Sequence, residues 1–97
     1  LILVKYFRNS FLANKVAFFN QVFDLCEATG INYDAVATGV GADKRIGTSH
    51  TSVTKERGFG GHCFPKDIQA LIYTAKQNGV DLTLLQEALE YNKKVRK

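Results

Sequence analysis

A glycine-rich segment that leads into a cysteine is the part of this sequence most able to do chemistry. It reads Gly58-Phe-Gly-Gly-His-Cys63-Phe-Pro65-Lys66-Asp67. Proline favours the first turn of a helix, so Pro65 predicts that a helix starts there with Cys63 at its N-terminal edge. Free amide groups at such an edge, together with nearby Lys66, favour the nucleophilic thiolate. Cys63 is therefore a candidate nucleophile, whereas the competing interpretation is an inert, buried thiol.

The neighbours of Cys63 add to the case for chemistry at this segment. Asp67 falls in the first turn of the expected helix, where a carboxylate is stabilised by the free amides. Gly60 and Gly61 have no Cβ and would let the main chain approach a ligand closely. His62 raises the idea of a thiol–imidazole dyad, but adjacent side chains normally diverge, which argues against a protease-like site.

The second cysteine, Cys26, lies in an apolar stripe without positive charge around it, which predicts an unreactive core thiol. Two isolated cysteines make no disulfide framework. The sequence has no Cys-x-x-Cys and no spaced histidine pair, so we predict no metal site.

A polar pair near the N-terminus is the other candidate for a functional site. Lys5 and Asn9 are four residues apart on an expected helix and so point the same way. They continue the apolar stripe of that helix, and polar groups on a buried stripe need a partner or a ligand. The alternative is that the stripe surfaces here and leaves both side chains in water.

Apolar periodicity predicts an all-helical chain, since no segment alternates as a strand does. The expected elements are a long helix from about Ile2 to Thr29 with Gly30 as its cap, a short helix from Asn32 or Asp34 to about Gly39, a loop from Gly39 to Gly61, a helix from Pro65 to Asn78-Gly79, and a helix from near Asp81 to about Val95.

The first helix carries two apolar stripes side by side. One consists of Leu12, Val16, Phe19, Phe23 and Cys26, and the other of Val4, Phe11, Phe18, Val22 and Leu25. Two stripes indicate a helix covered on more than one side. The second cover is either the rest of the same chain or another subunit, and the pattern slightly favours a dimer.

Composition limits the classes of partner. The chain has 97 residues with 45% apolar residues, which fits one small folded domain. It contains no methionine, so we expect it to be a segment of a longer protein. The net charge of +4 suits a phosphate-bearing partner such as a nucleotide, but it is too small and too dispersed for nucleic acid. We expect no membrane span and a reducing, cytoplasmic location.

Several motifs, taken in order, resemble those of a known family. They are Lys5-x-x-x-Asn9, Phe11-Leu12-Ala13, Asn20, Leu25-Cys26-Glu27, Asp43-x-Arg45-Ile46-Gly47 and Gly60-Gly61-x-Cys63-Phe64-x-Lys66-Asp67. Together they resemble the central domain of the UDP-glucose/GDP-mannose dehydrogenases. The resemblance implies that residues 1–97 form an all-α domain of the kind shared with 6-phosphogluconate dehydrogenase relatives. In the family this domain lies between an NAD-binding Rossmann domain and a C-terminal nucleotide-binding domain, and neither is in this chain.

The resemblance also implies a reaction and its catalytic residues. A nucleotide-sugar C6 alcohol would be oxidised to the carboxylate in two NAD-dependent steps, with NAD bound mainly outside this chain. Cys63 would form a thiohemiacetal and then a thioester. Lys5 and Asn9 would stabilise the oxyanion on C6, and Asp67 would position or activate water.

Further residues are implied in binding. Phe59, Gly60 and Gly61 would meet the sugar, and Lys66 would face the cofactor. Arg45 would reach into the active site of a neighbouring subunit, which implies a homodimer through the first helix.

The sequence departs from the family pattern in the loop before Cys63. Between Arg45 and Cys63 it is about two residues longer, it lacks the usual Phe-Leu and Pro-Gly elements, and it is polar from Thr48 to Arg57. The motifs favour UDP-glucose as substrate over GDP-mannose or a UDP-N-acetylhexosamine. The rival function is a non-catalytic dimerisation module, which need not have kept Lys5, Asn9, Cys63, Lys66 and Asp67 together.

Overall fold

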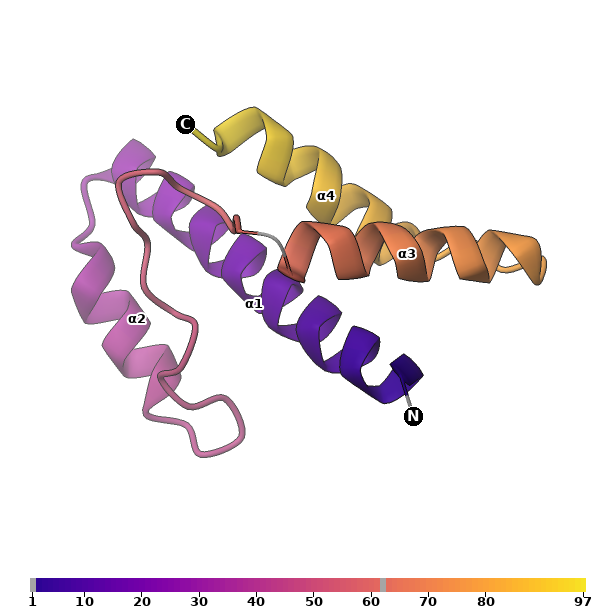
Figure 1. Ribbon diagram of the computed structural model, residues 1–97. Coiled ribbons are helices and arrows are strands. Elements are labelled where there is room, and N and C mark those ends of the chain that lie inside the picture. Colours follow the sequence, from indigo (N-terminus) through magenta and orange to yellow (C-terminus); the bar gives the residue numbers. More distant parts are fainter. Residues whose placement is uncertain (1, 62) are drawn as a thin grey trace.

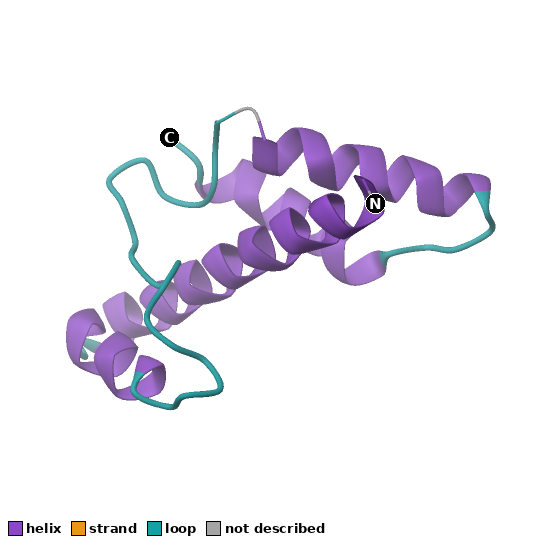
Figure 2. Ribbon diagram, turned by 60° about the horizontal axis from the view of Figure 1, so that its bottom comes forward, coloured by secondary structure: helices purple, strands orange, loops and turns teal. Residues whose placement is uncertain are grey.

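The computed structural model describes residues 2–61 and 63–97, with the side chain of Cys63 left out of the description. These residues form four α-helices, listed in chain order as α1 (Ile2–Thr29), α2 (Tyr33–Gly41), α3 (Cys63–Gln77) and α4 (Thr83–Val95) (Figure 1). No strand occurs among the described residues (Figure 2). The all-α class predicted from periodicity is confirmed.

The long helix α1 is the element against which the rest of the chain packs. It contacts α2, α3 and α4, and α3 also contacts α4. In Figure 1, α2 lies beside the C-terminal half of α1, and the loop after α2 returns along α1 before it reaches α3. This path brings the residues before Cys63 back to the middle of the first helix.

The buried face of α1 is made mainly of small and polar residues, with Phe19 as its one large apolar side chain. Ala13 and Ala17 join Phe59, Ile68 and Ala88 in the main core cluster. Alanine has little side chain, so α3 and α4 can pack close to the backbone of α1 at this point.

The two predicted stripes of α1 therefore have different outcomes. Phe19 and Cys26 of the first stripe are buried, which confirms Cys26 as a core residue. The second stripe is not covered by the chain itself, since Val4, Phe11, Phe18 and Leu25 are exposed. Apolar periodicity shows that a face tends to be covered, but it does not show by what.

The predicted helix ends hold in part. Asn32 caps α2 by accepting a hydrogen bond from the amide of Ala35 at 3.0 Å. The predicted end at Gly39 is wrong, because α2 continues to Gly41 and the loop begins after it.

The predicted start of the third helix at Pro65 is also wrong. α3 begins at Cys63, which makes Pro65 its third residue. The first amides of a helix have no partner within the helix, so proline is tolerated throughout the first turn and does not mark the first residue. None of the four helices, over the residues that the structure describes, is long and apolar enough to cross a lipid bilayer.

Candidate active site

The two sequence motifs with chemical potential meet where α1 crosses α3. The side-chain amide of Asn9 donates a hydrogen bond to Oδ2 of Asp67 at 2.7 Å, across 58 residues of sequence. Asp67 is only 6% exposed. A buried carboxylate needs a partner, and a hydrogen bond to an ionised group is stronger than one between neutral groups. The contact therefore holds Asp67 in one position facing α1.

The expectation that Asp67 lies in the first turn of its helix is wrong. Because α3 starts at Cys63, Asp67 is one full turn further in, and no acidic residue occupies the first turn. The carboxylate is thus stabilised by Asn9 of another helix and not by free amides at a helix end.

Lys5 and Asn9 differ in their surroundings although they share a face of α1. Asn9 is partly buried against α3, whereas Lys5, one turn earlier, is exposed and forms no ion pair within the described part of the chain. Of the two side chains that the alternative interpretation placed in water, only that of Lys5 is exposed. The Lys5 ammonium, exposed and without an ion pair among the described residues, belongs to the same helix as the fixed Asn9 amide, one turn away.

Cys63 lies one helical turn before Asp67 in the backbone of α3. Its side chain, and the whole of His62, lie outside the described residues. The position of Cys63 as the first residue of a helix agrees with the helix-edge setting expected for a reactive thiol.

The chain that approaches Cys63 has no regular secondary structure, yet side chains of two helices hold its peptide groups. Asn20 of α1 accepts a hydrogen bond from the Gly58 amide at 2.9 Å. Asn92 of α4 accepts from the Phe59 amide at 2.7 Å and donates to the Phe59 carbonyl at 2.9 Å. Both asparagines are buried. Buried peptide groups need partners, and here two asparagines replace the partners that a sheet would provide.

Glycine is required at Gly58, where a buried side chain fills the space a Cβ would need and φ is positive, whereas at Gly60 a Cβ would meet only the movable end of the Arg96 side chain. At Gly58 a Cβ would lie 2.1 Å from Oδ1 of Asn92, and φ is +60°. At Gly60 a Cβ would lie 2.1 Å from Nη2 of Arg96. We predicted open space beside the main chain at Gly60, but the Arg96 side chain occupies that space in this structure. At Gly61 the position of a Cβ has no neighbouring atom within 4 Å.

Phe59 has a different place from the two glycines that follow it. Its side chain is buried in the main core cluster, and both of its main-chain polar groups are bonded to Asn92. The contacts of Phe59 hold the segment in place, and Gly60 and Gly61 lie nearer to the surface. The contact of Phe59 with a sugar stays a prediction.

Arg57, which sequence reasoning did not single out, occupies the centre of a polar cluster beside this segment. Its Nε donates to Oδ1 of Asn20 at 2.9 Å and its Nη2 to Oδ1 of Asp24 at 2.6 Å. Its guanidinium carbon lies 4.8 Å from the centre of the Phe23 ring, within range of a cation–π contact. Asn20 and Asp24 are one turn apart on α1, a spacing that could have signalled a two-pronged acceptor.

The backbone of Arg57 is unusual as well. Its φ is +63°, in the left-handed region, which costs a residue with a side chain roughly 1–2 kcal/mol. Hydrogen bonds to charged groups contribute about 1.5–3 kcal/mol each. The side-chain contacts of Arg57 therefore suffice to hold its backbone in this conformation.

Tyr91 of α4 completes the cluster by donating from its hydroxyl to Oδ2 of Asp24. Burial, followed by the hydrogen bond to and the negative charge of Asp24, raises the pKa of Tyr91 to about 12, while Arg57 acts in the opposite direction. The neutral phenol is thus the form that the folded chain prefers.

A raised pKa in the fold has a defined consequence for stability. The contribution of Tyr91 should be fully present below its ordinary pKa of 10.0 and should be lost as the pH rises toward about 12. We expect ultraviolet absorbance titration of the folded protein to show late tyrosinate ionisation that Tyr91→Phe reduces without abolishing, because burial raises the pKa of Tyr33 as well. An unchanged late step in that variant would contradict the assignment.

Arg45 lies apart from these contacts, on the loop after α2. It forms a two-pronged pair with Asp43, with Nη2 to Oδ2 at 2.7 Å and Nε to Oδ1 at 3.0 Å. This pair lowers the pKa of Asp43. The Arg45 side chain is 89% exposed. Lys15 anchors the same loop to α1 by donating to the Ile46 carbonyl at 2.7 Å. Within the described residues, no contact joins Arg45 to Asn9 or Asp67.

Lys66 is exposed on α3, next to Asp67. Within the described residues, no group of three histidine, cysteine, aspartate or glutamate side chains is placed to hold a metal ion.

The arrangement combines a cysteine at a helix start, a fixed amide, a free ammonium and a held carboxylate. This set suits addition of a thiol to a carbonyl, because an amide and an ammonium can bind the oxyanion that forms. The carboxylate is the group that could accept a proton from water.

Comparison with known proteins identifies the family of the chain. Residues 2–94 match the model of the UDP-glucose/GDP-mannose dehydrogenase family, central domain. The chain is 46% identical over 91 residues to UDP-glucose 6-dehydrogenase of Rickettsia bellii, covering 94% of the chain and 20% of that protein. It is 43% identical over 94 residues to UDP-glucose 6-dehydrogenase TuaD of Bacillus subtilis, covering 97% of the chain and 20% of that protein.

A solved structure shows the same likeness. A UDP-glucose dehydrogenase from the hyperthermophilic archaeon Pyrobaculum islandicum superimposes with a TM-score of 0.87 and 39% identity, over 95% of this chain and 21% of that one. The chain thus spans about a fifth of the length of these relatives. The family match over nearly all of its residues shows that the chain belongs to the UDP-glucose/GDP-mannose dehydrogenase family.

Proposed function

We propose that this chain is the central domain of an enzyme that oxidises the C6 alcohol of UDP-glucose to the carboxylate with NAD. The observation that carries the proposal is the Asn9–Asp67 hydrogen bond, which brings the Lys5–Asn9 motif against the helix that Cys63 starts. The names of the relatives support UDP-glucose as the substrate. A Rossmann domain and a second nucleotide-binding domain would be supplied by the rest of the full-length protein.

The proposed reaction passes through a covalent intermediate. Loss of a hydride and a proton converts the C6 alcohol to an aldehyde, and the thiol of Cys63 adds to its carbonyl carbon to give a thiohemiacetal. Loss of a second hydride and proton gives a thioester, which water hydrolyses to the carboxylate and the free thiol. NAD would accept the hydride in both oxidations. The covalent bond prevents release of the aldehyde between the two steps.

The described side chains have separate roles in this proposal. Asn9 and Lys5 donate to the C6 oxygen when it carries negative charge, and Asn9 is already held in place by Asp67. The carboxylate of Asp67 takes a proton from the water that attacks the thioester.

Binding roles follow from exposure. Gly61, with an open side and a positive φ of +81°, offers main-chain groups to the sugar. Gly60 would do so only where the guanidinium of Arg96 moves aside. Lys66 is exposed on α3 and would reach a phosphate of the dinucleotide.

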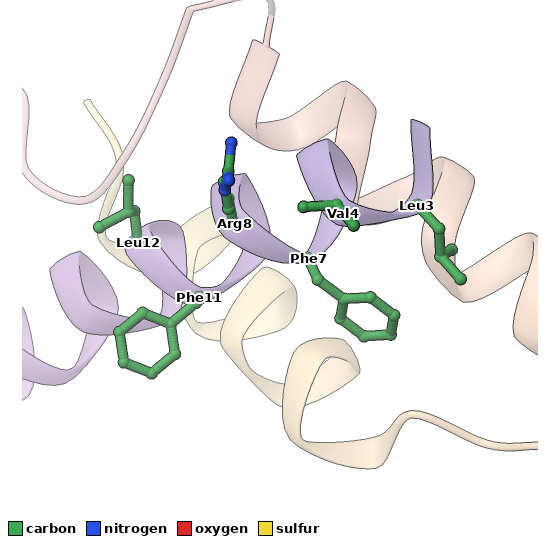
Figure 3. A pocket seen from close by; sticks show the side chains of 6 residues that line it. All are labelled: Leu3, Val4, Phe7, Arg8, Phe11 and Leu12. Atoms are coloured by element: carbon green, nitrogen blue, oxygen red, sulfur yellow. The ribbon is translucent and has the colours of Figure 1, made fainter. Parts of the chain in front are cut away.

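We further propose that the uncovered face of α1 is where a second copy of the chain packs. The accessible surface is 6669 Å², whereas a compact monomer of this size exposes roughly 5,500 Å². Large apolar side chains are exposed along this helix, with Phe11 at 68%. Figure 3 shows Leu3, Phe7 and Phe11 projecting from the same side of α1 into an apolar hollow.

Arg45 lies at the edge of this face. It lines a second hollow together with Phe11 and Phe18, two exposed residues of the uncovered stripe. A chain that covers the stripe would therefore meet the exposed guanidinium. This placement supports the idea that Arg45 completes the substrate site of the partner subunit, where an arginine contact to phosphate is charge-assisted.

Phe11→Glu should convert the full-length dimer into a monomer, because it places a charge in the middle of the apolar contact. The monomer should also lose most of its turnover, since Arg45 of a partner would be missing. Light scattering on a size-exclusion column measures the first effect and an NADH assay the second. Tyr73→Glu, at another exposed apolar residue on α3, should leave both unchanged. A Phe11→Glu protein that stays dimeric would place the interface elsewhere.

The proposed function is tested most directly by assaying the full-length protein with a panel of nucleotide sugars. UDP-glucose should yield two NADH for each carboxylate formed, and GDP-mannose or UDP-N-acetylglucosamine much less. No NADH with any of them would favour the rival function, a helical dimerisation module without catalysis.

A further inference from the structure

The polar cluster around Arg57 links helices α1 and α4 with the loop that precedes Cys63. The Arg57 side chain is 16% exposed and donates to Asn20 and Asp24 of α1, while Asp24 also accepts from Tyr91 of α4. Each acceptor oxygen of the Asp24 carboxylate is thus used by a different element. A cluster of this kind resists sliding of α4 along α1, because sliding would separate charged partners.

The same cluster is continuous with the contacts that shape the chain before Cys63. Oδ1 of Asn20 accepts from both the Arg57 side chain and the Gly58 amide. The Arg57 carbonyl accepts from Nη1 of Arg96 at 2.9 Å, and the next peptide groups are bound by Asn92. From Arg57 to Phe59, every residue is therefore held by a side chain from α1 or α4.

We propose that Arg57 is a positioning residue for catalysis, which locks the segment 57–59 and thereby sets where α3 begins. This inference rests on the proposed function of Cys63. Few residues separate Phe59 from Cys63, so a shift of the locked segment is passed to the start of the helix. One turn further along α3, the Asn9–Asp67 hydrogen bond holds the helix from the other side. The locked segment thus restrains the chain that leads into α3, and the Asn9–Asp67 hydrogen bond fixes the helix one turn after Cys63, which would keep the start of α3 at a constant distance from Asn9.

Because the φ of Arg57 is positive, suitable variants can distinguish the effect of its side chain from the effect of its backbone conformation. Arg57→Gly removes the guanidinium and adopts the observed φ of +63° without strain. Arg57→Lys keeps the charge but cannot bridge Asn20 and Asp24 with one planar group. Asp24→Asn leaves Arg57 in place and removes the charge to which it is bonded.

In the full-length enzyme, Arg57→Gly should lower kcat roughly tenfold to a hundredfold, because small displacements of reacting groups have effects of that size. KM for UDP-glucose should change much less, since Arg57 does not touch the substrate. Arg57→Lys should be intermediate. Asp24→Asn should lower kcat as well, and the double variant should be no worse than Arg57→Gly, because the two residues act through one contact.

A second measurement does not depend on turnover. The rate at which iodoacetamide alkylates Cys63, followed by peptide mass spectrometry, reports on the helix-edge setting of the thiol. This rate should change at least about threefold in Arg57→Gly while thermal unfolding stays cooperative. Lys93→Ala, which removes an exposed ion pair with Glu90 on α4, should change neither kcat nor the alkylation rate.

These measurements test the positioning role of Arg57 separately from the proposed dehydrogenase function. A wild-type protein without dehydrogenase activity refutes the proposed function, and an altered alkylation rate would then still show that Arg57 sets the position of Cys63. If kcat and the alkylation rate stay at wild-type values in folded Arg57→Gly, Arg57 contributes only to stability and the inference is wrong. If Arg57→Gly fails to fold, wild-type values of both in Asp24→Asn would overturn it in the same way.

Discussion

Cys63→Ser in the full-length enzyme should stop the reaction at a covalent ester. A hydroxyl can still add to the aldehyde, and the second oxidation would then give an ester. An ester is a poorer acyl donor than a thioester, so hydrolysis should become the slow step. Intact-mass spectrometry after incubation with NAD and UDP-glucose should show a protein carrying the acyl adduct, while steady-state NADH formation falls by several orders of magnitude.

Two further variants complete this experiment. Cys63→Ala should form no adduct and no carboxylate but should keep the fold, because the change removes one small group at the start of α3. Cys26→Ser should keep the reaction and affect only stability, since Cys26 is buried in the core of α1. Turnover of Cys63→Ser near the wild-type rate would show that Cys63 is not the nucleophile.

Asp67→Asn should have the second largest effect, and it should fall on the hydrolysis of the thioester. The asparagine carbonyl can accept the hydrogen bond that Asn9 now donates to Asp67, so the contact between α1 and α3 should survive. What is lost is the carboxylate that takes a proton from water, a role worth typically 10²–10⁴-fold in rate. Stopped-flow absorbance should show a rapid burst of NADH followed by a slow phase.

A variant of Asn9, the hydrogen-bond partner of Asp67, distinguishes the positioning of Asp67 from its role in proton transfer. Asn9→Ala leaves the buried Asp67 carboxylate without its donor, which should destabilise the fold by about 1–3 kcal/mol. It should also slow the first oxidation, because the oxyanion loses a donor. Asp81→Asn, at an exposed carboxylate before α4, is the matched control and should change neither phase. A single-phase, wild-type time course for Asp67→Asn would exclude Asp67 from hydrolysis.

The helices could be predicted from local sequence alone, because helix formation depends mainly on residues within a few positions of one another. The all-α class and the span of α1 from Ile2 to Thr29 were predictable, and the cap of α2 was narrowed to Asn32 or Asp34, of which the structure shows Asn32. Motifs that stay together in the sequence also pointed to the family. The errors at Gly39 and Pro65 have a local cause, since glycine is tolerated within a helix and proline is tolerated anywhere in the first turn.

The contacts between distant side chains depend on how the helices and the long loop pack in three dimensions. The pairing of Asn9 with Asp67 spans 58 residues, and that of Arg57 with Asn20 spans 37. No periodic pattern records such contacts, because they depend on where the long loop after α2 returns to α1. The small residues Ala13 and Ala17 show the same limit. These two alanines let α3 and α4 approach α1 closely. A pattern that ranks residues by hydrophobicity instead predicts that larger side chains form the buried face of α1, and several of those side chains are exposed.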